Sequence, residues 1–148
     1  MSFMTRSRQR EEVFKLVFQV ELIPEKVWEE HFHNYLNHLT DLSEEDKEGI
    51  FNRAKTVLTH ITNIDILLND KTVGWKTNRM NKVDLAILRL AVYEILYDED
   101  IPEGVAINEG VELAKKYSGD DGPAFVNGVL GKFAKKPIKK SSKESTEK

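Results

Sequence analysis

Cysteine is absent from the 148 residues, which excludes disulfide bonds and thiol chemistry and suits a reducing compartment. No uninterrupted apolar run is long enough to cross a bilayer, for which about 18 residues are needed, so we expect no membrane span. The first residues, Met1 to Arg6, lack the apolar stretch and small-residue cleavage site of a secretory signal. We therefore expect the protein to stay in the cytoplasm.

Residue patterns for catalysis, cofactor binding and metal binding are missing as well. No two of the four histidines are four residues apart, whereas zinc sites usually contain closely spaced ligand pairs. The acids between residues 44 and 48 have no nucleophile or base beside them in the sequence. A glycine-rich phosphate loop is also lacking. We expect a protein that is not an enzyme and binds no cofactor or metal.

Charge is distributed unevenly, although the net charge is only −3. Residues 1–20 carry +2 and residues 132–148 carry +5, which leaves −10 on residues 21–131. The first segment contains Arg6, Arg8 and Arg10, and the last contains seven lysines. Basic ends on an acidic body are compatible with a nucleic-acid partner despite the negative total.

Apolar residues recur at helical spacing along most of the chain, which predicts an all-α fold of about seven helices. Thr5 and Ser43 are suitable caps for the first and third helices, and Pro24 suits the first turn of the second. The expected helices cover residues 6–20, 25–39, 44–68 with a break near 62–63, 83–97, 106–117 and 121–133.

The chain length suits one domain, which we expect over residues 1–136. Residues 137–148 have almost no apolar side chains to bury, so they are expected to form a disordered, lysine-rich tail.

The segment from Val83 to Tyr97 is apolar on nearly every face, so other helices must enclose it. Its charged residues are Asp84, Arg89 and Glu94. Asp84 falls in the first turn, where the helix dipole favours an acid. Arg89 and Glu94 are expected to form ion pairs, because an unpaired buried charge is costly.

Four sequence strings, with their order and spacing, resemble the NusB family of bacterial transcription antitermination factors. They are DLAILRLAVYE (84–94), VAINE (105–109), LAK (113–115) and FVNGVL (125–130), with a weaker match at RSRQRE (6–11). The resemblance implies an antitermination factor that binds the single-stranded boxA RNA of ribosomal-RNA operon leaders. It also implies joint binding with ribosomal protein NusE, which bridges to the RNA polymerase elongation complex and promotes processive elongation.

The arginines of the first helix are the first candidate RNA contacts. Helical geometry places Arg6 and Arg10 on one face and Arg8 about 160° away. Guanidinium groups bind phosphate and stack on bases. Composition alone favours a solvated helix start, whereas the resemblance favours RNA contact. Lys15, where the family usually has glutamine, adds positive charge, and Val13 replaces a usual alanine.

The start of the last helix is the second candidate RNA contact, through Asp121, Phe125 and Asn127. Free backbone N–H groups and the positive dipole end favour phosphate there. Phe125 could equally be a core anchor, and Asn127 could cap or bridge helices. The carboxylate of Asp121 would weaken RNA binding and so tune its affinity downward.

Phe18, Leu22 and Asp84 are the candidate contacts with NusE, by resemblance. Core packing is the alternative for Phe18 and Leu22, and the helix dipole is the alternative for Asp84. An interaction adaptor without specific RNA binding is the rival function. NusB-like domains also occur fused to ribosomal-RNA cytosine methyltransferases, but 148 residues leave no room for the cofactor-binding domain. The resemblance is compatible with a monomer or a homodimer.

Overall fold

The computed structural model describes residues 4–74 and 76–134, and these are helical without any strand. The α-helices are α1 (Arg6–Gln19), α2 (Trp28–Asn37), α3 (Glu44–Thr59), α4 (Ile61–Lys71), α5 (Lys82–Tyr97), α6 (Glu103–Tyr117) and α7 (Gly122–Gly131). Two short 3-10 helices, η1 (Glu25–Val27) and η2 (Thr77–Arg79), precede α2 and α5. The predicted all-α fold with seven helices is confirmed.

The tail predicted over residues 137–148, and the domain end predicted at 136, lie outside the described residues. Among residues 4–74 and 76–134, none of the helices combines the length and the hydrophobicity of a membrane span.

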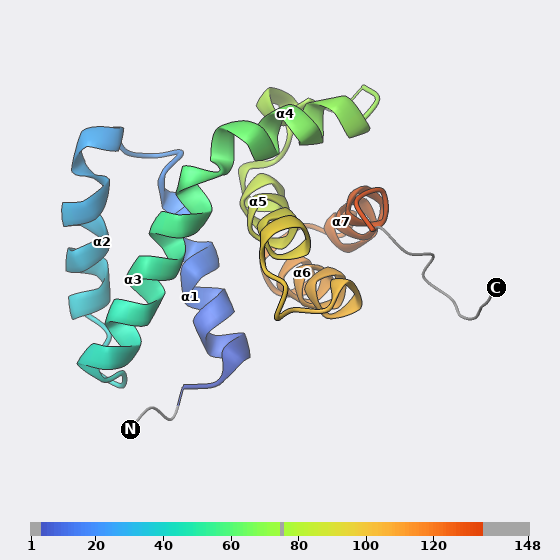
Figure 1. Ribbon diagram of the computed structural model, residues 1–148. Helices are drawn as coiled ribbons and strands as arrows, with labels where there is room; N and C mark the ends of the chain where they lie inside the picture. The colour runs from blue at the N-terminus through green and yellow to red at the C-terminus, as the bar shows by residue number, and fades with distance from the viewer. Residues whose placement is uncertain (1–3, 75, 135–148) are drawn as a thin grey trace.

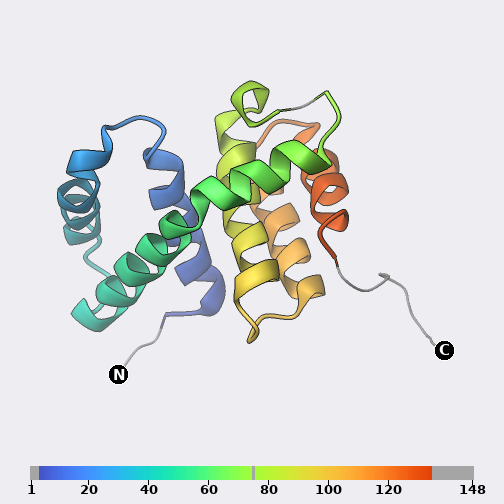
Figure 2. The same cartoon turned by 45° about the horizontal axis from the view of Figure 1, so that its top comes forward.

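The helices form two groups that meet along α1 and α5 (Figure 1). Helices α1, α2 and α3 make up one group, and α5, α6 and α7 make up the other. Helices α3 and α4 follow one another along a diagonal that runs from the first group across α5 (Figure 2). Helix α1 therefore packs against α3 on one side and α5 on the other.

Side-chain caps start three of the helices. The Thr5 hydroxyl accepts a hydrogen bond from the Arg8 backbone N–H, and the Ser43 hydroxyl accepts one from Asp46, each at 3.0 Å. Asn81 caps α5 in the same way, through the Val83 N–H at 2.7 Å. Each cap satisfies at least one of the N–H groups that lack a partner within the helix, and Asn81 also accepts from the Asp84 N–H. The predicted caps Thr5 and Ser43 are confirmed.

Several helix boundaries differ from the prediction, including the ends of α2, α4 and α7, which fall at Asn37, Lys71 and Gly131. Pro24 has an extended backbone (ψ 146°) before the 3-10 turn, so the second α-helix begins only at Trp28. The break between α3 and α4 falls at His60, two residues before the predicted site. Helix α6 begins three residues earlier than predicted, because Pro102 serves as its N-cap and Gly104 is accommodated within its first turn.

The core is centred on α5, in which every residue from Asp84 to Ile95 is buried. Arg89 donates two hydrogen bonds to Asp65 of α4, at 2.9 and 2.7 Å, and one to Glu21 at 2.7 Å. Glu94 accepts from the Arg10 Nε at 2.9 Å. The predicted ion pairing of Arg89 and Glu94 is confirmed, and these pairs tie α5 to α1 and α4.

Candidate nucleic-acid interface

The three arginines of α1 have different surroundings. Arg6 is exposed and forms no ion pair with the residues that the structure describes. Arg8 donates to both carboxylate oxygens of Asp41, at 2.7 and 3.3 Å. Arg10 is only 9% exposed and is paired with Glu94. Arg6 and Arg10 line the same cleft while Arg8 reaches the other side, which agrees with the predicted helical spacing.

Arg8 and Lys15 lie on one face of α1 and share the carboxylate of Glu12. The Arg8 Nε lies 2.9 Å from Glu12 Oε2, and the Lys15 Nζ lies 3.7 Å from the same atom. Tyr35 donates its hydroxyl to the other oxygen at 2.8 Å. The hydrogen bonds to Asp41, and then those to Glu12, raise the pKa of Arg8 above its usual range. Both cations are partly exposed, as phosphate contacts require.

Tyr117 and Lys116, at the end of α6, continue this face. The Tyr117 ring centroid lies 6.0 Å from the Lys15 Nζ and 5.4 Å from the Lys116 Nζ. Glu11 accepts hydrogen bonds from Tyr117 and, at 2.7 Å, from Lys116. Sequence reasoning missed Lys116 and Tyr117, although a basic residue next to an aromatic one is itself a signal for nucleic-acid contact. We call Arg8, Lys15, Lys116 and Tyr117 the basic face.

The turn from α6 to α7 is held close to the start of α5. The Ser118 hydroxyl donates to the Asp84 Oδ1 at 2.6 Å. A Cβ on Gly122 would lie 2.1 Å from the Ser118 Oγ, so the close packing of this turn requires glycine. Asp121 occupies the N-cap position of α7 without a side-chain capping bond, and it is exposed. Its carboxylate therefore faces solvent beside the N–H groups of the helix start.

Phe125 and Asn127 line two different hollows. Phe125 is half-buried against the core and borders a hollow of about 350 Å³ that Asp84 and Asp121 also line. Asn127 is exposed and borders a hollow of about 480 Å³ between α6 and α7. The partial exposure of Phe125 leaves both predicted roles, base stacking and core packing, compatible with its position.

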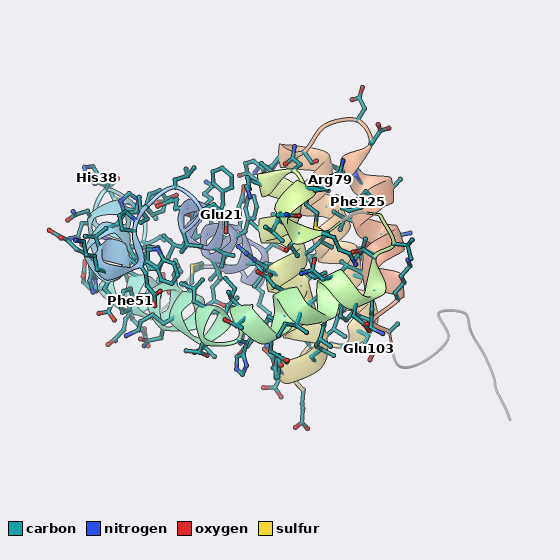
Figure 3. The ribbon with its side chains drawn as sticks, turned by 90° about the horizontal axis from the view of Figure 1, so that it is seen from above. Glu21, His38, Phe51, Arg79, Glu103 and Phe125 are labelled. Carbon is teal, nitrogen blue, oxygen red and sulfur yellow. The ribbon has the colours of Figure 1, made fainter. Side chains whose placement is uncertain are left out.

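Arg79 is a basic residue near this hollow that sequence reasoning did not select. It is exposed and directly precedes Met80, which lines the same hollow as Phe125. Figure 3 shows Arg79 and Phe125 on the same side of α5. A basic residue just before the cap of the central helix could have been recognised from the sequence.

The three candidate partner contacts differ in exposure. Leu22 is 66% exposed, which is unusual for a large apolar side chain, whereas Phe18 is half-buried against the core. Asp84 is buried and bound to Ser118. Glu21 lies where the end of α1 meets α5 (Figure 3) and pairs with Lys82 at 3.3 Å. This pair holds Leu22 near the start of α5.

The candidate RNA contacts extend along most of the molecule. Arg6 lies beside Asp98 at the end of α5, and Phe125 lies beside Asp84 at its start. The 16 residues of α5 correspond to about 24 Å. The basic face adjoins the start of α5, because Lys15 is near Tyr117 and the adjacent Ser118 contacts Asp84.

Comparisons with known proteins agree on one family. The NusB family model matches residues 7–135. The transcription antitermination protein NusB of Agathobacter rectalis is 50% identical over 131 residues, which cover 88% of this chain and all of that protein. The solved structure of T. maritima NusB is 34% identical, covering 89% of this chain and 92% of that one, with a TM-score of 0.77.

A solved complex of antitermination factors NusB and NusE with dsRNA is similar in fold. Its matching chain is 24% identical and has a TM-score of 0.72, with 89% of this chain and 98% of that chain covered. The family match covers most of the helical domain, and the curated relative is matched over its whole length. The chain therefore belongs to the NusB family, a family of transcription antitermination proteins and not of enzymes.

Proposed function

We propose that this protein binds single-stranded boxA RNA of ribosomal-RNA leaders together with NusE, and that NusE links it to the RNA polymerase elongation complex in the cytoplasm. The observation that carries the RNA part is the basic face between α1 and the start of α7. The solved NusB complex contains NusE and dsRNA, which supports the joint binding of NusE and RNA by this chain. Antitermination follows when the complex travels with polymerase.

Each RNA contact has a distinct physical role. Arg6 has no ion pair to break among the described residues, so it is ready to bind phosphate. Arg8 exchanges the exposed carboxylate of Asp41 for a phosphate. Lys15 and Lys116, whose Nζ atoms lie 6.0 and 5.4 Å from the Tyr117 ring centroid, supply phosphate contacts. Arg10, which is nearly buried, positions α1 on α5 and contacts RNA least.

At the start of α7, a side chain that can stack on a base lies near one that repels phosphate. The ring of Phe125 is partly exposed and can stack on a base. The side-chain amide of Asn127 can form hydrogen bonds in the hollow between α6 and α7. Asp121 places a negative charge beside them and lowers the affinity. Removing Asp121 should therefore tighten RNA binding.

NusE contacts the surface near the end of α1, where Leu22 is the exposed apolar anchor. Asp84 acts on both partners, because it lies near this surface and also lines the hollow beside Phe125. NusE and RNA bound next to one another raise each other's effective concentration. NusE should increase the affinity of the protein for boxA RNA, and Leu22→Ala should reduce that increase by about tenfold. Val73→Ala, at an apolar residue that is 90% exposed after α4, is the matched control.

The decisive experiment is fluorescence anisotropy with boxA RNA and a scrambled RNA, with and without NusE, over a series of salt concentrations. Lys15→Ala/Lys116→Ala should weaken boxA binding and reduce the slope of log K against log salt by about 0.7 for each phosphate that is no longer neutralised. Lys26→Ala, at an exposed lysine of η1, should leave the boxA affinity and the salt slope unchanged. If both RNAs bind equally and NusE changes nothing, the protein is an interaction adaptor instead.

A further inference from the structure

The hollow of about 480 Å³ between α6 and α7 is formed by neither the basic face nor the hollow beside Phe125. It is lined by Ile107, Asn108 and Val111 of α6 and by Pro123, Ala124 and Asn127 of α7. Figure 2 shows α6 and α7 side by side and antiparallel, so the end of α7 lies beside the start of α6. The hollow is therefore a groove that follows both helices.

The groove has an apolar floor with one amide on each side. Ile107 is 6% exposed and Val111 is half-buried, whereas Asn108 and Asn127 are exposed. Neither amide side chain forms a hydrogen bond with any residue in 4–74 or 76–134. An amide both donates and accepts, so two amides on opposite sides can bond the N–H and C=O groups of an extended backbone. The groove therefore suits an extended peptide that carries an apolar side chain.

The residues that follow α7 supply such a peptide at the right place. Residues 135–140 read KKPIKK, and Ile138 is the one aliphatic side chain among residues 135–148. Helix α7 ends one turn after Asn127, which shares the groove with Gly104 at the start of α6. The ten residues of α7 span about 15 Å, and six extended residues span about 20 Å. Residues 135–140 are therefore long enough to run back along α7 through the groove.

The charges at the two ends of the groove complement this segment. Glu103 directly precedes Gly104 at one end, and Asp120 and Asp121 precede Pro123 at the other. Residues 135–140 carry two lysines before Pro137 and two after Ile138. An extended segment that is antiparallel to α7 brings the first pair toward Glu103 and the second toward the two aspartates. Exposed ion pairs contribute little energy, so they set the direction while the buried apolar side chain supplies the affinity.

We propose that residues 135–140 bind in this groove of their own chain, with Ile138 on Ile107 and Val111 and with peptide groups bonded to Asn108 and Asn127. Pro137 favours this course, because the residue before a proline prefers an extended backbone to a continued helix. The bound segment covers Asn127, so it competes with RNA for the groove. This competition rests on the proposed function, whereas the contact within the chain does not.

Two-dimensional amide NMR spectra of the full chain and of Ile138→Ser test the contact. The variant should shift the side-chain amide signals of Asn108 and Asn127 and the backbone signal of Val111, because the segment then leaves the groove. Ser142→Ala, beyond the binding segment, should leave these signals in place. Shifts of Ile138→Ser that are confined to the residues after α7 would overturn the proposal. Groove signals that move with protein concentration would also overturn it, since the occupant would then be a second copy.

A spin label tests the direction of the segment. The chain has no cysteine, so Ser142→Cys provides a single site for a nitroxide. The label should broaden the signal of Ala124, which lines the groove, more than that of Gly128, which does not. Gly128 is nearer to the end of α7, so a segment outside the groove would give the opposite order. Ile138→Ser in the labelled chain should produce that opposite order. Stronger broadening at Gly128 in the labelled chain that retains Ile138 would refute the proposed course.

Anisotropy with boxA RNA tests the competition separately. Ile138→Ser should tighten boxA binding about two- to fivefold, which corresponds to a groove occupied in about half to four-fifths of the molecules. The salt slope should not change, because the variant retains every lysine. Unchanged boxA affinity, together with the NMR shifts, would keep the contact and refute the competition. Equal binding of boxA and scrambled RNA would refute the proposed function and leave the contact established by NMR.

Discussion

Replacing Arg10 with alanine removes a charge pair at the contact between α1 and α5. The two side chains are 9% and 3% exposed, and the Arg10 Nε lies 2.9 Å from Glu94 Oε2. The variant leaves both carboxylate oxygens of Glu94 buried without this partner. Breaking a buried pair in this way costs about 3–5 kcal/mol of unfolding free energy. The second contact of Arg10, 3.2 Å to the partly exposed Glu109, adds little because solvent screens it.

The unfolding free energy that Arg10→Ala removes should depend on pH. Burial raises the pKa of Glu94, and Arg10 is the strongest influence that opposes the rise. Without Arg10 the folded-state pKa rises further above the unfolded value of about 4.3. The folded protein then holds the Glu94 proton more tightly than the unfolded chain, so its stability falls as pH rises through that interval. The destabilisation should be larger at pH 8 than at pH 5.

Urea unfolding, followed by circular dichroism at pH 5 and pH 8, measures both effects. Arg10→Met combined with Glu94→Leu is the informative control, because replacing both partners with apolar groups removes the buried charge. The double variant should recover most of the stability that Arg10→Ala removes. A cost below about 1 kcal/mol, or the same cost at both pH values, would show that this pair does not hold α1 on α5 as argued.

Two further predictions concern the turn before α7 and the charge balance of α1. Gly122→Ala should lower the unfolding free energy by about 1–3 kcal/mol, because the new Cβ would lie 2.1 Å from the Ser118 Oγ. Gly128→Ala, with open space around its Cβ, should instead stabilise the protein by about 0.5–1 kcal/mol in the same urea experiment. Asp41→Asn should strengthen boxA binding about two- to fivefold in anisotropy at constant salt, since no carboxylate then competes for Arg8 at this position; unchanged affinity would exclude Arg8 as a phosphate contact.

Local features of the fold follow from the sequence alone. The spacing of apolar residues identified all seven helices, and Thr5 and Ser43 marked the starts of two of them. The apolar character of residues 83–97 predicted an enclosed central helix, and its charges were expected to be paired. These inferences succeed because helix periodicity and capping depend on residues within one or two turns.

Only the tertiary structure decided which distant residues meet. Arg10 meets Glu94 and Arg8 meets Asp41, although 84 and 33 positions separate them in the chain. The basic face joins Lys15 of α1 to Tyr117 of α6, a contact that the packing of the two helices decides. Periodicity shows which side of a helix is buried, but the neighbour on that side depends on how the helices pack. The sequence thus determined the helices and their buried faces, and the packing of α1 between α3 and α5 determined which charges were available for a ligand.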